Sequence, residues 1–305
     1  MKTIGTLTLL AATLVTPAML RAQENPVPTT AVISVDTKRD APVDTNAITL
    51  DVNGKKTAIE AVQPIKSQQL EVAILIDDGL RSSFGIQLED MSKFLLSLPP
   101  DTKVMVGYMS NGTVRAASGF ITDKEALAKQ IRLPFSSPGI SASPYFCLSD
   151  FVKHWPSNAR AARVVLMISN GVDPYNGSVS PLNQNSPYVQ QAQEDALRAG
   201  VTVYALYYGD AGMRGMAANF SGQSYLQQVA SATGGESLYN GTITPPSLRP
   251  YLDRFAGYLK ESYFLTFNAA QGHEKNGNVL RLKVKTQQSG AKVRAPDTVR
   301  VGNDN

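Results

Sequence analysis

Two adjacent aspartates, Asp77 and Asp78, follow directly on an apolar run, Val72–Ile76. A short and nearly continuous apolar run predicts a strand that is buried on both faces. The chain then enters a turn that contains Gly79 and Arg81. Carboxylates at the end of a buried strand are the oxygen ligands that divalent cations prefer. The segment therefore predicts a polar, charge-binding site where this strand ends.

Two further loops supply polar side chains that we expect at the same edge. Ser141 and Ser143 lie in a Gly- and Ser-rich loop, and Asn170 and Asp173 follow another apolar run, Val164–Ile168. In an open parallel sheet, ligands bind in the crevice outside the carboxyl ends of the strands. We therefore predict that these side chains and the aspartate pair line one partner-binding edge.

Strands and helices alternate from residue 70 to residue 263. The apolar runs are Val72–Ile76, Val104–Met109, Val164–Ile168 and Val201–Tyr208. Amphipathic stretches separate the runs, which predicts a doubly wound α/β fold with a mostly parallel, Rossmann-like sheet. Residues 108–116 contain the turn Ser110-Asn111-Gly112, which predicts one antiparallel edge strand.

Alternating β patterns flank this domain, which we place at residues 68–262. In the first flank, residues 45–66, the dipeptide Asn53-Gly54 predicts a tight hairpin. In the second flank, residues 263–302, alternation returns after a predicted helix. Each flank is too small to form a core alone, so we expect the two to pair as one small β element.

The first 22 residues are typical of a secretory signal peptide, with Lys2 before an apolar stretch, 4–20. Residues 23–44 would then form a leader. No other segment approaches the roughly 18 consecutive apolar residues of a spanning helix, so we expect no stable membrane insertion. The predicted location is the periplasm or the cell exterior after signal-peptide cleavage.

Charge and cysteine content exclude two classes of protein. The chain has 29 basic and 25 acidic residues, a net charge of +4, and loss of Lys2 and Arg21 with the signal would leave +2. That is not the surplus of a nucleic-acid-binding protein. The single cysteine, Cys147, excludes an intrachain disulfide, and its apolar surroundings predict a buried, inert thiol.

The ordered set of motifs resembles the von Willebrand factor type A domain. The set comprises the strand with Asp77, the hairpin GYMSNGTVRAASGF, the loop leading into YFCLSDFV, and VVLMISNGVD. The flanking β segments resemble those of the exported bacterial branch of this family found in acidobacteria. The resemblance covers about residues 45–302 and implies a module that grips partner proteins.

In that family, Asp-x-Ser-x-Ser after the first strand helps to hold a divalent cation. Asp77 matches the first aspartate, but Gly79 and Arg81 stand where the serines belong. Counting from Asp78 instead recovers only Ser82. The resemblance therefore implies a degenerate metal site.

The other expected metal ligands are also altered. Ser141 or Ser143 would replace the family's threonine, and Asn170 stands where the second acidic residue belongs, with Asp173 displaced. Mg²⁺ normally relies on one or two carboxylates, and a nearby guanidinium would repel it. We expect no metal cofactor; if Mg²⁺ binds weakly, its ligands would be Asp77, Ser141 and Ser143.

Two interpretations of Arg81 remain open. It either points inward, replaces the cation beside Asp77 or Asp78 and offers donors to a partner's carboxylate, or lies in the solvated first turn of a helix. We expect an exported, non-enzymatic adhesion or scaffold module that binds an unknown protein or peptide, and no nucleic acid. The alternatives are a hydrolase acting at the same edge and a scaffold whose strand-end site is vestigial.

Overall fold

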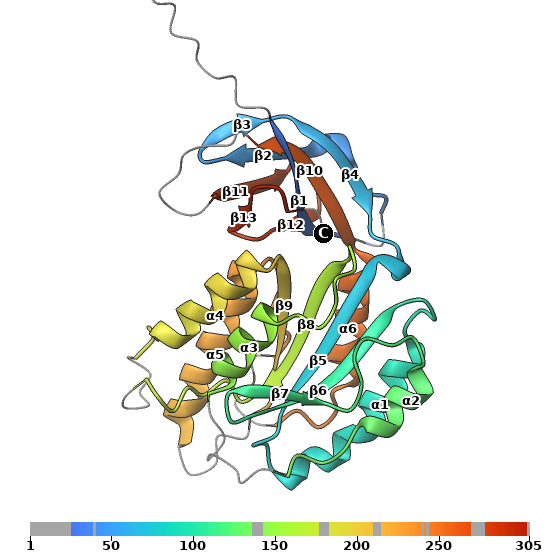
Figure 1. Ribbon diagram of the computed structural model, residues 1–305, viewed down its shortest axis with the longest axis vertical. Coiled ribbons are helices and arrows are strands. Elements are labelled where there is room, and N and C mark those ends of the chain that lie inside the picture. The colour runs from blue at the N-terminus through green and yellow to red at the C-terminus, as the bar shows by residue number, and fades with distance from the viewer. Residues whose placement is uncertain are drawn as a thin grey trace, which may run out of the picture.

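The computed structural model describes residues 26–38, 41–135, 143–176, 183–209, 215–239, 241, 244–269 and 278–303, with the side chains of 215–218 excepted. Two parts lie one above the other: a β module made from both flanks of the chain, and an α/β domain between them in the sequence (Figure 1). Ser141 and residues 1–25 lie outside the described residues.

The α/β domain is built on a five-stranded sheet with the order β7-β6-β5-β8-β9. Its strands are β5 (Leu70–Asp77), β6 (Lys103–Ser110), β7 (Thr113–Ala116), β8 (Ala162–Ser169) and β9 (Val201–Tyr207). All neighbours pair in parallel except β7, which pairs with β6 in antiparallel fashion. The predicted doubly wound fold with one antiparallel edge strand is confirmed.

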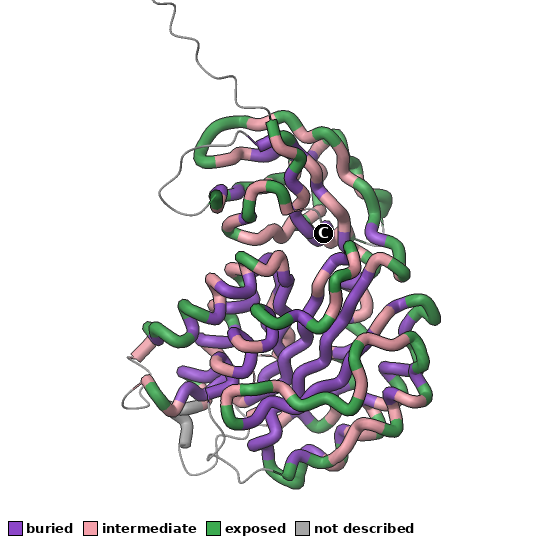
Figure 2. The backbone as a smooth tube through the Cα atoms, viewed as in Figure 1, coloured by how far each residue is buried: buried purple, intermediate pink, exposed green. Residues whose placement is uncertain are grey.

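Helices cover both faces of this sheet (Figure 1). One face carries α1 (Leu88–Ser97), α2 (Lys124–Gln130) and α6 (Arg249–Lys260), and the other carries α3 (Pro144–Lys153), α4 (Pro187–Arg198) and α5 (Gly215–Ala232). Alternate residues of β5 point to opposite faces of the sheet. Ile74 and Ile76 pack in the core under α1, α2 and α6, and Ala73 and Leu75 pack in the core under α3, α4 and α5. The strands are therefore buried on both sides (Figure 2).

The β module consists of two four-stranded sheets with the orders β12-β1-β10-β4 and β13-β11-β2-β3. Its strands are β1 (Val27–Thr37), β2 (Ile48–Val52), β3 (Lys55–Thr57), β4 (Ile59–Pro64), β10 (Ser262–Ala269), β11 (Val279–Thr286), β12 (Ala291–Arg294) and β13 (Thr298–Arg300). In the first sheet, strands from the two flanks alternate, since β1 pairs with β10 and β12, and β10 pairs with β4. In the second sheet, the two flanks meet where β11 pairs with β2. Short 3-10 helices complete the described structure: η2 (Thr45–Ala47), η3 (Ser67–Gln69) and η4 (Ser82–Gln87).

The leader expected at residues 23–44 is instead largely a strand, β1. Ile33 and Val35 alternate into the core of the β module, whereas Val32 faces the core of the α/β domain. The strand is therefore buried from both sides. Its apolar residues belong to the folded structure, although they follow closely on the expected cleavage point.

The hairpin predicted at Asn53-Gly54 is present. Both residues have positive φ, 50° and 78°, and β2 pairs with β3 from Val52 and Lys55 outwards. Positive φ at both central residues is the requirement of the tight turn that this dipeptide favours.

None of the helices within the described ranges is long and apolar enough to cross a membrane.

A pair of glycines holds α5 against the end of β8. Gly171 has φ +67°, and a Cβ there would lie 2.4 Å from the carbonyl oxygen of Gly222. A Cβ on Gly222 would lie 2.0 Å from the carbonyl oxygen of Asn170. Only glycine permits this approach, because real Cβ atoms do not come so close to backbone.

We expect Gly171→Ala to lower the free energy of unfolding by more than about 3 kcal/mol, through both backbone strain and overlap with α5. Gly54→Ala is the matched control: its φ is +78° but nothing lies within 4 Å of the added Cβ, so strain alone should cost about 1 kcal/mol. Urea denaturation measures both values. Equal losses in the two variants would contradict the proposed role of the contact with Gly222.

Candidate functional site

Strand β5 delivers Asp77 to the edge of the sheet, where the carboxylate joins two strands. Its Oδ1 accepts the Gly79 N–H at 2.9 Å, and its Oδ2 accepts the Ser169 hydroxyl at 2.8 Å. Ser169 Oγ in turn accepts the Gly171 N–H at 2.9 Å. Asp77 is only 5% exposed, so its charge is stabilised by donors of the chain itself.

Asp78 pairs with a cation that the sequence analysis did not identify. Arg132 donates Nη1 and Nη2 to the two carboxylate oxygens of Asp78 at 2.7 and 3.2 Å, a bidentate ion pair. The Phe135 N–H donates to Asp78 Oδ1 at 3.2 Å. Asp78 is 3% exposed, whereas the Arg132 side chain is 34% exposed. The pair therefore presents a guanidinium, and not a carboxylate, to the solvent.

Two aromatic rings hold this guanidinium in place. Its carbon lies 3.7 Å from the centroid of the Tyr108 ring and 3.9 Å from that of Phe135. The Tyr108 hydroxyl donates to the Arg132 carbonyl at 2.9 Å and accepts the Arg132 N–H at 2.6 Å. Burial is the main reason that the pKa of Tyr108 is raised, so the hydroxyl keeps its proton at neutral pH.

Arg81 is exposed and occupies the N-cap of η4, with extended backbone angles of −73° and 162°. Ser82, the next residue, is exposed as well. One interpretation placed Arg81 inward, beside Asp78. In the structure Arg132 pairs with Asp78 instead. The chain turns into η4 directly after Gly79, whereas the loop after α2 returns across the edge and brings Arg132 onto Asp78.

The predicted residues after β8 bind within their own loop. Asn170 Oδ1 accepts the Val172 N–H at 3.0 Å. Asp173 accepts the Tyr175 N–H at 3.1 Å and the Ser186 hydroxyl at 2.6 Å, and Ser186 is the N-cap of α4. Asp173 is 3% exposed, so its carboxylate stabilises the start of a helix.

Ser143 also caps a helix. It is fully buried, and its hydroxyl accepts the Tyr145 N–H at 3.4 Å at the start of α3. The Tyr145 hydroxyl donates to the Gly171 carbonyl at 2.8 Å, which ties α3 to the loop after β8. Cys147 is buried as predicted, and burial raises its pKa to about 12, so the thiol is not an activated nucleophile.

These contacts decide whether the edge fits a divalent cation. Both oxygens of Asp77 accept hydrogen bonds from the chain, and a guanidinium already neutralises Asp78. Among the residues that the structure describes, no three His, Cys, Asp or Glu side chains are placed to hold a metal ion together. A divalent cation at this edge would therefore compete with donors and a countercharge that the chain itself supplies, and the absence of a metal cofactor stays a prediction.

Large exposed apolar side chains lie in the loop of Arg132 and in the neighbouring η4. Phe135 is 71% exposed, Ile86 68% and Leu133 44%. Leu133 lies against η4, since a Cβ on Gly85 would approach its Cδ2 to 2.9 Å. Exposed apolar residues that gather around a cation are typical of an interaction surface.

A second aromatic group lies at the same edge, where α3 and α4 begin. The Phe146 ring contacts Tyr175 at 5.1 Å and Tyr188 at 4.8 Å between centroids. Tyr175 is 55% exposed and Tyr188 36%. The strand ends are thus flanked by rings on both sides.

The sequence carried one signal for the missed residues. Arg132-Leu133-Pro134-Phe135 directly follows a predicted helix, and two large apolar residues beside an arginine are unusual in a loop. No periodicity shows that this loop crosses to Asp78, so the pairing itself is visible only in three dimensions.

No protein-family model matches the chain, and no curated protein matches it. Among solved structures, the chain is similar to a von Willebrand factor type A protein from Catenulispora acidiphila, with 11% identity, 91% of this chain and 75% of the other covered, and a TM-score of 0.43. It is also similar to a manganese-loaded TRAP protein from Plasmodium vivax, with 12% identity, coverage of 80% and 98%, and a TM-score of 0.43. A third is an aerotolerance-related membrane protein from Bacteroides fragilis, with 13% identity, coverage of 62% and 98%, and a TM-score of 0.44.

These likenesses concern the fold alone. The strand order β7-β6-β5-β8-β9, with its antiparallel edge strand and helices on both faces, is the doubly wound α/β arrangement that the sequence predicts. The resemblance to an acidobacterial branch stays a prediction.

We expect Arg132→Leu to lower the free energy of unfolding by about 2–4 kcal/mol, because Asp78 would keep a buried charge without its countercharge. Arg81→Leu removes an arginine from the same edge at an exposed position and should cost less than about 1 kcal/mol, since even an exposed ion pair adds no more than that. Chemical denaturation of both variants tests the assignment. An equal loss in both would show that Arg132 is not the countercharge on which Asp78 depends.

Proposed function

We propose that this chain is an exported, non-enzymatic protein-binding module that engages a protein or peptide partner at the strand-end edge of its α/β domain. Asp77, Asp78, Gly79, Arg81, Ser82, Ser141, Ser143, Asn170 and Asp173 are the residues of that edge that the sequence nominates. We add Arg132 and Phe135, which both donate hydrogen bonds to Asp78. Export is supported by the signal-like first 22 residues.

The observation that carries the proposal is that the guanidinium of Arg132 uses only some of its N–H donors within the chain. Of the five N–H donors of an arginine, two go to Asp78 and one goes to the Leu133 carbonyl at 2.8 Å. The Nε–H and one Nη2–H have no partner among the described residues. Because Asp78 and two rings fix the group, it is preorganised to receive a carboxylate or carbonyl of a partner.

The exposed apolar side chains of Phe135, Ile86 and Leu133, which we call the apolar rim, support the same conclusion. Aromatic side chains and arginine are enriched at protein interfaces, where a few residues supply most of the binding free energy. Phe135, which stacks on Arg132, is such an anchor, and Leu133 and Ile86 add exposed apolar surface in the adjoining segments. The partner we expect is a protein segment with an acidic group next to an apolar one.

This mode of binding needs no divalent cation. We expect calorimetric titration with Mg²⁺ or Mn²⁺ to give no saturable heat up to millimolar concentration, because donors of the chain already occupy the carboxylates. Arg132→Ser is the informative companion variant, since it removes the resident cation from Asp78. Saturable Mg²⁺ binding by the wild-type protein would contradict a cation-independent edge.

Capture of proteins from the source envelope tests the partner-binding role. Phe135→Ala should reduce capture of the partner by more than about 30-fold, the effect of removing a central aromatic anchor. Leu96→Ala is the matched control, because Leu96 is a large apolar side chain on α1 that is 54% exposed and lies outside the rim.

Capture that Phe135→Ala leaves unchanged would contradict binding at this edge and favour the alternative of a scaffold whose strand-end edge is inert. Circular dichroism of both variants provides the control for folding. Wild-type protein that captures nothing specific above the level of an unrelated exported protein would also count against the proposal.

A further inference from the structure

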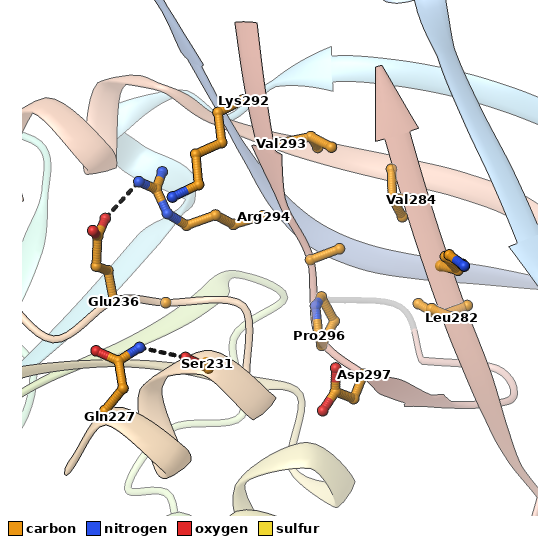
Figure 3. Close-up of a pocket in the computed structure, with 13 residues that line it drawn as sticks. Gln227, Ser231, Glu236, Leu282, Val284, Lys292, Val293, Arg294, Pro296 and Asp297 are labelled. Carbon is orange, nitrogen blue, oxygen red and sulfur yellow. Dashed lines mark hydrogen bonds and ion pairs between the residues drawn. The ribbon is translucent and has the colours of Figure 1, made fainter. Parts of the chain in front are cut away.

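A pocket of about 360 Å³ lies where the β module meets the α/β domain, away from the strand-end edge. Its wall on the α/β side comes from the last turns of α5 and the segment up to Glu236, and the opposite wall comes from β11 and from residues 292–297 (Figure 3). Pockets of this size hold ligands as large as one or two amino acid residues.

The junction that forms the pocket is held by the backbone. The Asp297 N–H donates to the Ala232 carbonyl at 2.8 Å, across the two parts of the molecule. Gly234 has φ +83°, and a Cβ there would lie 2.8 Å from the carbonyl carbon of Ala295. The two walls are thus fixed relative to each other, so the pocket is preformed.

One side of the pocket carries more positive than negative charge. Arg294, whose side chain is only 10% exposed, pairs with Glu236 at 2.5 Å. That carboxylate also accepts the Tyr258 hydroxyl. The other guanidinium nitrogen of Arg294, Nη1, is buried and has no hydrogen-bond partner among the described residues. A buried donor without an acceptor leaves the charge of the guanidinium only partly compensated, so Arg294 adds positive potential to the pocket that it lines.

Lys292 places a second cation in the lining of the pocket. It stands two residues before Arg294 on β12, so both side chains leave the strand on the same side (Figure 3). Asp36 lies opposite Lys292 in the pairing of β1 with β12, yet its carboxylate is bound by Arg254 at 2.5 Å. Within the described chain Lys292 has no ion-pair partner.

Charge counting gives the same result. Among the residues that line the pocket, the cations Lys283, Lys292 and Arg294 face the carboxylates Glu236 and Asp297, which leaves an excess of one positive charge. Two cations that converge without enough countercharge repel each other, and one anion between them removes the repulsion.

The other side of the pocket is apolar. Leu282 and Val284 of β11 and Val293 of β12 line it, opposite the charged group (Figure 3). A ligand that fills the pocket therefore has one negative group and one apolar group close together.

We propose that this junction pocket binds a carboxylate that carries an apolar side group, as found at the end of a peptide chain, with Arg294 and Lys292 receiving the carboxylate. The pocket is independent of the strand-end edge and adds a second binding site to the molecule.

Calorimetry with N-acetyl-leucine as the probe tests this site. We expect saturable binding at millimolar concentration, as for a small ligand, and no binding of N-acetyl-leucinamide, which has the same side group but no charge. Inorganic phosphate, an anion without an apolar group, should bind at least about 10-fold more weakly than N-acetyl-leucine.

Lys292→Gln should weaken binding of N-acetyl-leucine by about 3- to 10-fold. Lys285→Gln is the matched control, because Lys285 is exposed on β11 and does not line the pocket, so affinity should stay within about twofold. Thermal unfolding of both variants establishes that they fold. No saturable binding, equal binding of the amide or of phosphate, or an affinity that Lys292→Gln leaves unchanged would each overturn the proposal.

Discussion

Asp77 and Asp78 end a strand that lies in the middle of the five-stranded sheet, where almost no water reaches their charges. Burying a carboxylate is unfavourable unless donors or a cation compensate it. Asp77 is compensated by hydrogen bonds that tie β5 to β8, and Asp78 is compensated by Arg132, which fixes the loop after α2. The hydrogen bonds of Asp77 and the ion pair of Asp78 therefore determine how the loops are arranged at the strand-end edge.

The same requirement explains how two adjacent aspartates can be accommodated where a strand ends. A divalent cation is one way to neutralise carboxylates at a strand end, and a guanidinium clamped between two rings is another. The arginine brings directional donors and a flat apolar surface with its charge. A clamped guanidinium favours ligands that match the direction of its donors and also pack against the rings. A divalent cation favours ligands that supply negative charge and oxygen atoms.

Sequence patterns predicted the α/β domain well because its signals are local. Apolar runs such as Val164–Ile168 and the turn at Asn111-Gly112 each depend on residues that are neighbours in the chain, and the same holds for the hairpin at Asn53-Gly54 in the β module. The site was harder to predict, since the partner of Asp78 is 54 residues away and no pattern encodes that contact. Strand β1 was mistaken for a leader because its pairing partner, β10, lies at the other end of the chain.

The division of the chain between the two parts has a mechanical consequence. The polypeptide passes between the α/β domain and the β module at two neighbouring places, where β4 leads through η3 into β5 and where α6 leads directly into β10 (Figure 1). If the β module is tethered while a partner pulls on the strand-end edge, tension enters β4 and β10 side by side, and these two strands are hydrogen-bonded to each other. Force would therefore load the β module through one joined pair of strands, and the long antiparallel pairing of β10 with β1 would share it along its whole register.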